Sequence, residues 1–422
     1  MERYGLSLVE LKKNGSFADA AAARSVVAVL AADAPTDVIV LVHGWNNDMD
    51  QARSLYRRLI GCLESVERGA GSAPGDPRVV GVLWPSIQWA DESQVAGGGA
   101  GVASPADELR RAIVARVEDA ALAQKLAALV PQLDGSAAAR AEYLRGLRTL
   151  LSPESGDPDV VPPTLVTGSA DTVFERASAL VGGGEGRAGG GAANGAAAGG
   201  GAGPGGGAAG LNLGGFVRRG RSLLNTFSYF QMRARSGDAG SVGVAGLLAD
   251  LAGEIPGARL HLVGHSFGAR AATAAASAAT VPIASLTLLQ AAFSHYALAE
   301  NWKDGQDGIF HRVPSRLTGP LIVTHTRKDR AVGLAYALIS RIAGQVAVGV
   351  GDRDDPYGGL GSNGALKTPS ASFSDLLAPG GTYSFLPKHV HNLKGDPFIS
   401  GHGAIDNDAV AYALWRAMAL GS

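Results

Sequence analysis

The sequence predicts an α/β protein built around a doubly wound, mainly parallel β-sheet. Short apolar runs rich in Val, Ile and Leu predict strands that are buried on both faces. Helical segments follow these runs, and the strand-then-helix order recurs on both sides of a long, glycine-rich interruption. At 422 residues, the chain exceeds what one hydrophobic core usually organises, so we expect a core with a large insertion.

The first predicted strand is the run Asp37-Val38-Ile39-Val40-Leu41-Val42, which ends at His43-Gly44-Trp45. Asp48 and Gln51 then have the spacing of a capping box at the start of an amphipathic helix. Residues 78–84 predict a second strand. Strand, loop, helix and strand therefore follow one another within the first 85 residues.

Residues 86–235 predict an insertion or cap, which divides the core into an N-terminal part, 1–85, and a C-terminal part, 236–422. Within the insertion, residues 182–210 are almost only Gly and Ala. Such a tract buries too little apolar surface to offset its chain entropy, so we interpret it as a flexible linker. Helices are expected at 105–128 and 137–151.

Residues 211–232 differ from the linker because they carry many large apolar side chains. This segment could be a lid over an active site or a helix that docks on the core. Its arginines, Arg218, Arg219 and Arg221, leave a third possibility, peripheral contact with a membrane surface.

Regular alternation of strands and helices returns after the insertion and supports the same α/β fold class. Helices are expected at 240–254, 269–279, 331–343 and 408–420, and strands at 259–263, 283–290, 321–326 and 382–385.

Composition excludes several classes of partner. Lys and Arg number 37 against 38 Asp and Glu, so no broad charge favours nucleic acid. No stretch reaches the roughly 18 apolar residues of a membrane-spanning helix. Cys62 is the single cysteine and the N-terminal residues lack a secretory pattern, so we expect a cytoplasmic protein. We find no zinc spacing or P-loop and expect no cofactor or metal.

The segment Gly264-His265-Ser266-Phe267-Gly268 follows an apolar strand and precedes an Ala-rich helix. Gly-x-Ser-x-Gly in that setting is typical of a nucleophile elbow. The strained turn brings the residues two before and two after the serine against backbone, where a β-carbon would clash. We therefore predict Ser266 as a nucleophile with positive φ, at a helix N-terminus whose dipole favours developing negative charge.

At these residues the chain resembles the α/β-hydrolase superfamily, over about residues 37–85 and 240–421. His43-Gly44-Trp45 resembles the oxyanion loop of its esterases and lipases. The resemblance implies the α/β-hydrolase fold and an oxyanion hole formed by the backbone N–H groups of Phe267 and Trp45. The alternative is that Gly44 only ends a strand.

A serine nucleophile needs a histidine base, and the superfamily's chain order is serine, acid, histidine. Of the nine histidines, only His389, His391 and His402 follow every plausible acid. His389 and His391 border or occupy the last apolar run, where packed or surface roles are expected. His402 lies in a Ser-Gly-His-Gly loop between the last strand and the last helix, which is where the superfamily places its base. We predict His402, with His391 as the alternative.

The predicted acid is Asp329, in a short polar loop after the strand at 321–326. This position matches the acid of the superfamily. A helix N-cap would need the same residue type, so capping is the alternative role. Asp352, Asp354 and Asp355 form a charged cluster that we interpret as a solvated loop or a cation site, and Asp396 is a further candidate acid.

These residues together predict a serine hydrolase that cleaves carboxylic esters through a Ser266–His402–Asp329 triad and an acyl-enzyme. The substrate would be a small or lipid-like acyl compound. Lipase-like and acyltransferase activities use the same triad, and a non-catalytic binding protein with this fold is the rival from another class.

Overall fold

The computed structural model describes residues 3–45, 48–70, 75–86, 104–151, 161–177, 215–329, 331–332, 339 and 357–419. Several predictions lie outside these residues. They are the linker at 182–210, residues 211–214, the cluster of Asp352, Asp354 and Asp355, and most of the helix at 331–343.

The described residues form an eight-stranded sheet in the order β1-β3-β2-β4-β5-β6-β8-β7, and every neighbouring pair is parallel. The expected α/β class and parallel sheet are therefore confirmed. The strands are β1 (Leu6–Glu10), β2 (Asp37–Val42), β3 (Pro77–Leu83), β4 (Arg259–His265), β5 (Ser285–Leu289), β6 (Leu321–His325), β7 (Ala371–Asp375) and β8 (Val390–Lys394).

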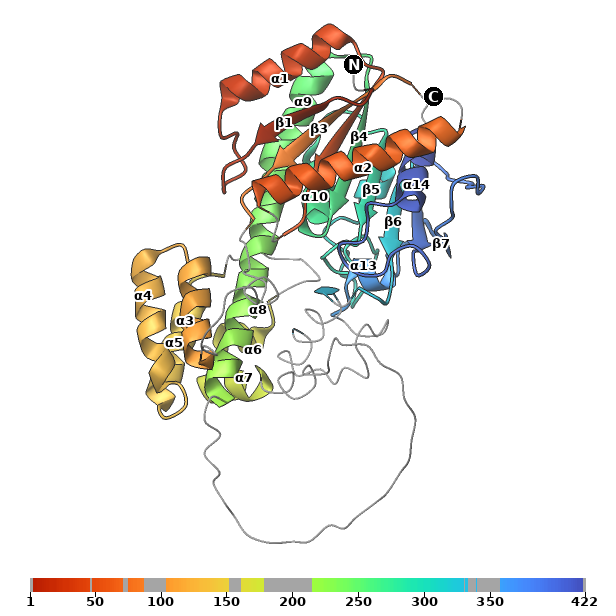
Figure 1. The fold of residues 1–422 in the computed structure, drawn as a ribbon. Coiled ribbons are helices and arrows are strands. Elements are labelled where there is room, and N and C mark those ends of the chain that lie inside the picture. The colour runs from red at the N-terminus through yellow and green to blue at the C-terminus, as the bar shows by residue number, and fades with distance from the viewer. Residues whose placement is uncertain are drawn as a thin grey trace, which may run out of the picture.

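Helices cover both faces of the sheet, as Figure 1 shows. One face packs against α1 (Ala20–Asp33), α9 (Ala245–Glu254) and α10 (Phe267–Ala278). The other face packs against α2 (Met49–Ala70) and α14 (Asp408–Ala419). Because both faces are covered, the central strand β2 is buried along its whole length, as its continuous apolar sequence predicts.

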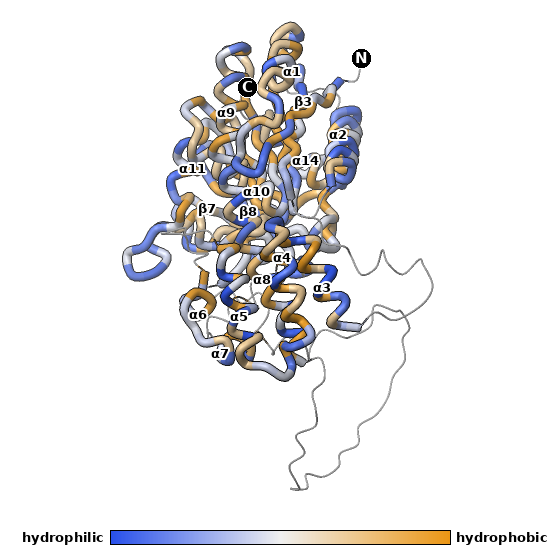
Figure 2. Tube along the Cα trace, turned by 90° about the vertical axis from the view of Figure 1, so that its left-hand side faces the viewer, coloured by the Kyte–Doolittle hydropathy of each residue, from blue (hydrophilic) through white to orange (hydrophobic). Residues whose placement is uncertain are grey.

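The amphipathic helix α2 begins as its capping-box spacing predicts. The backbone N–H of Asp48 donates to Gln51 Oε1 at 3.0 Å, and the N–H of Gln51 donates to Asp48 Oδ1 at 2.6 Å. Leu59 and Leu63 face the core, whereas hydrophilic residues line its outer side in Figure 2.

The prediction of a strand at 382–385 is wrong. Tyr383 and Phe385 instead lie in a loop, where their rings stack at 4.5 Å and pack into the core. The Tyr383 hydroxyl accepts the backbone N–H of Leu377 at 2.7 Å, which fixes the loop. The alternating aromatic residues thus pack a loop onto the core. The strand that pairs with β6 is β8, Val390–Lys394.

The insertion contains short helices that pack with the N-terminal half of α8 (Gly215–Asp238), as Figure 1 shows. α8 continues without a break through a π-helical segment, Ala239–Val244, into α9. The helix expected at 240–254 is therefore continuous with α8. Residue 235, where the insertion was expected to end, lies inside this continuous helix. The shorter helices are α3 (Pro105–Arg116), α4 (Ala120–Leu129), α5 (Ala137–Arg148), α6 (Pro163–Thr167) and α7 (Ala170–Ala177).

α8 docks on the core through its apolar residues. Leu223, Phe227 and Phe230 are all buried. Arg221 forms an ion pair with Glu108 of α3 at 2.8 Å, so this arginine ties α8 to the helices of the insertion. Among the described residues, no helix is both long enough and apolar enough to cross a membrane.

Candidate active site

Ser266 stands at a sharp turn between β4 and α10. Its φ of 57° and ψ of −122° lie outside the usual regions for a residue with a side chain, and its positive φ agrees with the sequence prediction. The turn is possible because Gly264 and Gly268 meet backbone directly. A β-carbon on Gly268 would lie 2.1 Å from the carbonyl oxygen of Val42, and one on Gly264 would lie 2.3 Å from that of Gly268.

His402 lies beside Ser266, in the loop between β8 and α14. Its Nε2 is 2.8 Å from Ser266 Oγ, and its Nδ1 is 2.8 Å from Asp329 Oδ2. Because the Asp329 carboxylate can only accept, Nδ1 carries the proton and Nε2 is left to accept the Ser266 hydroxyl. The three predicted triad residues are thus connected by two hydrogen bonds.

His391, the alternative base, has other partners. It lies on β8, where its Nε2 accepts the backbone N–H of Leu386 at 2.9 Å and its Nδ1 is 3.2 Å from Ser372 Oγ. Burial lowers the pKa of His391 to about 4. Its side chain has the packed role that its place in an apolar run indicates.

Asp329 is buried in the loop after β6, with 1% of its surface exposed. Its Oδ2 meets His402, while its Oδ1 accepts the backbone N–H of Val332 at 3.1 Å. The second contact has the geometry of an N-cap, so one carboxylate both meets His402 and accepts a capping backbone N–H. Asp396, the further candidate acid, instead accepts the Thr326 hydroxyl at 2.7 Å and pairs with Lys394.

Gln290, which sequence reasoning missed, also touches Asp329. It follows β5 directly, and its Nε2 donates to Asp329 Oδ2 at 3.1 Å. The sequence signal was a single polar residue at the carboxyl end of a buried strand, the edge where parallel sheets place functional groups.

The loop after β2 lies against Ser266. A β-carbon on Gly44 would lie only 2.7 Å from Ser266 Cβ, so the loop approaches as closely as a glycine allows. The Trp45 ring meets the Phe267 ring edge-on at 5.6 Å. Phe267 is the first residue of α10, where N–H groups have no acceptor within the helix. The two residues predicted for the oxyanion hole are therefore neighbours beside Ser266.

His43 holds that loop in place. Its Nε2 accepts the backbone N–H of Trp84 at 3.2 Å, and its Nδ1 donates to the Gly44 carbonyl at 2.8 Å. The imidazole also stacks on the Trp84 ring. Burial lowers the pKa of His43 to about 4, so it is neutral at neutral pH and acts as a structural link between the ends of β2 and β3.

His265 supports the loop of the base. Its Nε2 donates to the backbone carbonyl of His402 at 2.9 Å, and the two rings lie 4.9 Å apart. Burial, and next the neighbouring His402, lower the pKa of His265 to about 3. A neutral His265 therefore fixes the backbone of His402 without adding a charge beside the site.

α8 also reaches Phe267, the residue after Ser266. Its Tyr229 ring is 5.1 Å from the ring of Phe267, on a part of the helix that packs against α10. Trp45 and Tyr229 thus both contact Phe267, the residue after Ser266.

A second Ser–His–Asp group lies at the opposite ends of the strands. His261 of β4 meets Asp37 Oδ1 through Nε2 at 2.9 Å and Ser285 Oγ through Nδ1 at 2.8 Å. Arg259 pairs with the same Asp37 oxygen at 2.8 Å. Burial lowers the pKa of His261, and Asp37 only partly opposes that effect. All three side chains of this group are completely buried.

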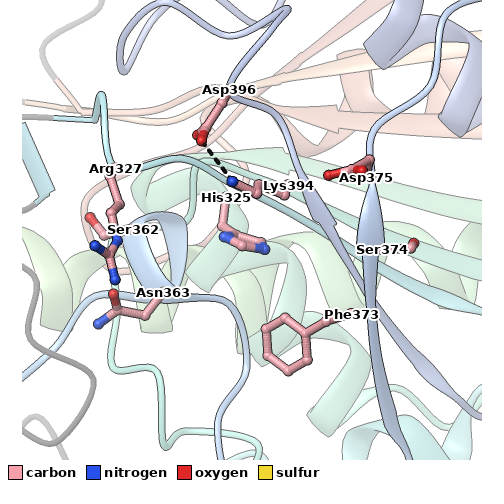
Figure 3. A pocket seen from close by; sticks show the side chains of 9 residues that line it. All are labelled: His325, Arg327, Ser362, Asn363, Phe373, Ser374, Asp375, Lys394 and Asp396. Carbon is pink, nitrogen blue, oxygen red and sulfur yellow. Dashed lines mark ion pairs between the residues drawn. The ribbon is translucent and has the colours of Figure 1, made fainter.

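A pocket of about 590 Å³ lies at the carboxyl ends of β6, β8 and β7 (Figure 3). The Thr326 hydroxyl, three residues before Asp329, donates to Asp396 of this pocket at 2.7 Å. The pocket carries charges of both signs and so defines no single class of ligand. Its side chains include His325, Arg327, Phe373, Asp375, Lys394 and Asp396.

Within the described ranges, no group of three or more His, Cys, Asp or Glu side chains is placed to hold a metal ion. Comparison with protein-family models, with curated proteins and with solved structures finds no match to this chain. Any assignment of function therefore depends on the chemistry of the site itself.

Proposed function

We propose that the protein is a serine hydrolase that cleaves carboxylic esters through an acyl-enzyme intermediate. One observation carries the proposal: Ser266, His402 and Asp329 form a continuous hydrogen-bonded series with both links at 2.8 Å, and the serine stands on a strained turn at a helix N-terminus. This arrangement supplies a nucleophile, a base that accepts its proton, and a carboxylate that orients the base.

In the proposed reaction, Ser266 Oγ attacks the ester carbonyl carbon while His402 Nε2 takes the hydroxyl proton. The carbonyl electrons move onto oxygen, and Asp329 stabilises the imidazolium. When the tetrahedral intermediate collapses, the C–O bond to the alcohol breaks and His402 gives the proton to the leaving oxygen. Water then repeats the sequence on the acyl-enzyme and releases the acid.

The negative oxygen of each tetrahedral intermediate needs hydrogen-bond donors. We assign this role to the backbone N–H groups of Phe267 and Trp45. The position of Phe267 at the start of α10 supports the assignment, because the helix dipole there favours negative charge. The close approach of Gly44 to Ser266 supports it as well, because it brings the Trp45 loop to the nucleophile.

Membership of the α/β-hydrolase superfamily is part of the proposal. The nucleophile follows the central strand β4, the acid follows β6, and the base follows β8, which is in the chain order serine, acid, histidine. The sheet itself differs, since the α/β-hydrolase fold has a mixed sheet and all eight strands described here are parallel.

Aromatic side chains favour substrates with an apolar acyl group. Trp45, which is partly exposed, and Tyr229 of α8, which is buried, both contact Phe267 next to Ser266, so the surroundings of the nucleophile are apolar. Lipase-like hydrolysis or transfer of the acyl group to an alcohol would use the same residues, with an alcohol replacing water in the second step.

The test is labelling by a fluorophosphonate probe together with turnover of p-nitrophenyl esters of increasing chain length. We expect the native protein and Ser285→Ala to be labelled and Ser266→Ala not to be. His402→Ala should lose turnover, whereas His391→Ala should keep it. Equal labelling of the native protein and Ser266→Ala would show that the nucleophile is a different residue.

A further inference from the structure

Gln290 is a buried residue held in an unusual backbone conformation beside the acid. It follows β5 directly, its side chain is completely buried, and its φ is 44°. A non-glycine residue in the left-handed region carries backbone strain, which persists only where the surroundings enforce it. The strain directs the side chain toward the loop of Asp329.

The amide of Gln290 has a partner for each of its polar atoms. Its Nε2 donates to Asp329 Oδ2 at 3.1 Å and to the Gly361 carbonyl at 3.0 Å. Its Oε1 accepts the Thr324 hydroxyl at 3.1 Å, and that hydroxyl accepts the backbone N–H of Gln290 at 3.2 Å.

These partners determine the orientation of the amide. Exchanging its oxygen and nitrogen would place the amide oxygen against the Asp329 carboxylate and the Gly361 carbonyl, which are both acceptors. The Thr324 hydroxyl would in turn face an NH₂ group instead of an acceptor. The NH₂ group of Gln290 therefore points at the carboxylate.

Asp329 Oδ2 thus receives two donors, His402 Nδ1 and Gln290 Nε2, while Oδ1 is held by the Val332 backbone. A carboxylate held at both oxygens cannot rotate away from His402. A buried carboxylate also loses its hydration, and the Gln290 amide replaces part of it.

We propose that Gln290 is a positioning residue of the active site, which fixes the Asp329 carboxylate so that it holds His402 with Nε2 facing Ser266. Thr324 takes part by locking the amide. This inference rests on the proposed function, because the role is defined by the triad. The Gln290 amide acts through Asp329, to which it donates.

Gln290→Met tests the role, because methionine has a similar length and no strong donor. We expect kcat for a p-nitrophenyl ester to fall about tenfold with KM within about twofold, since the missing hydrogen bond holds the carboxylate that stabilises the imidazolium, which forms only after substrate binds. The acid limb of the pH profile should move to higher pH. Without the Gln290 donor, the negative charge on Asp329 Oδ2 interacts with His402 alone and favours its protonated form.

Thr324 offers a matched pair of variants. Thr324→Val removes the hydroxyl and keeps the shape, so it should change kcat and the acid limb in the same direction as Gln290→Met but by less. Thr324→Ser keeps the hydroxyl and should resemble the native protein. Native kcat and pH profile in folded Gln290→Met, or equal losses in both Thr324 variants, would overturn the positioning role.

A readout without turnover separates this inference from the proposed function. In ¹⁵N-labelled protein, the exchange of the His402 Nδ1 proton with solvent should be faster in Gln290→Met than in the native protein. If the native protein is not labelled by the fluorophosphonate and cleaves no ester but this difference appears, the hydrolase proposal fails and the contact stands. If the native protein cleaves esters but the exchange rate is unchanged in Gln290→Met, the positioning role fails and the hydrolase proposal stands.

Discussion

The molecule holds two Ser–His–Asp groups, one at each end of its sheet. Ser266, His402 and Asp329 lie at the carboxyl ends of the strands, whereas Ser285, His261 and Asp37 lie near the amino ends. Their hydrogen-bond distances are alike, between 2.8 and 2.9 Å. Three residue types at hydrogen-bonding distance therefore do not define a catalytic site.

The two groups differ in access and in backbone. The His402 side chain is 25% exposed, whereas that of His261 is completely buried between strands. Ser266 stands on a strained turn at the start of α10, but Ser285 is an ordinary residue of β5. The helix N-terminus beside the first serine would favour negative charge on a bound carbonyl oxygen, and the second serine lacks such a position.

Their aspartates also differ in their other partners. Asp37 Oδ1 meets both His261 and Arg259, and Thr36 donates to its Oδ2. Burial alone would raise the pKa of Asp37, but the hydrogen bonds from His261, Thr36 and Arg259 outweigh burial and lower it. The second group is thus a buried ion pair that joins β2, β4 and β5.

Substituting the two aspartates should separate the groups most strongly. Asp329→Asn should lower kcat/KM for an ester by about ten-thousandfold, since an amide can hold His402 in the wrong tautomer. Asp37→Asn should leave kcat/KM nearly unchanged but lower the free energy of unfolding by about 3 kcal/mol, because Arg259 loses its buried partner. Urea unfolding and ester kinetics on both variants measure the contrast, and a large loss of activity in folded Asp37→Asn would contradict it.

Acid should destabilise the protein through its buried histidines. His43 and His391 have folded pKa values of about 4, below the ordinary value, because burial disfavours their charged forms. Between about pH 6.5 and 4, the unfolded chain therefore binds protons that the folded chain does not, and stability falls as the pH falls. For fully buried His43 the loss approaches about 3 kcal/mol.

Urea unfolding measured from pH 7 to pH 4 tests this prediction. His261 should add to the loss in the same direction, since burial also lowers its pKa. The lowered pKa of Asp37 affects the free energy of unfolding in a more acidic range. The stability that Asp37 contributes is lost only as the pH falls below the ordinary pKa of an aspartate, about 4. A free energy of unfolding that stays constant from pH 6.5 to 4.5 would show that these histidines are not neutral and buried.

Gly44→Ala should give the smallest effect, an activity loss between tenfold and a hundredfold. The new β-carbon would lie 2.7 Å from Ser266 Cβ, so the loop or the serine must shift, and displacements of this kind weaken the reacting geometry. Gly61→Ala in α2 is the control, because its β-carbon would meet nothing within 4 Å. Ester kinetics of both variants would measure the effect, and equal activities would show that the loop yields without cost.

Local signals in the sequence predicted much of this architecture. Continuous apolar runs predicted β2, β4, β5 and β6, and the spacing of Asp48 and Gln51 predicted how α2 begins. The edge strand β1 was missed because it is only partly buried and carries no continuous apolar run. The aromatic pattern around Tyr383 was misread because a packed loop and a strand can bury the same side chains.

The sequence by itself determined the strand-to-helix turn at Ser266, because its glycines and its flanking strand and helix are neighbours along the chain. Only the tertiary structure decided which histidine meets that serine and which aspartate meets the histidine, since His402 is 136 residues from Ser266 and 73 from Asp329. It also revealed Gln290 and the buried group around His261, because the partners of a side chain across a sheet depend on strand order and register. No local pattern in the chain records that order.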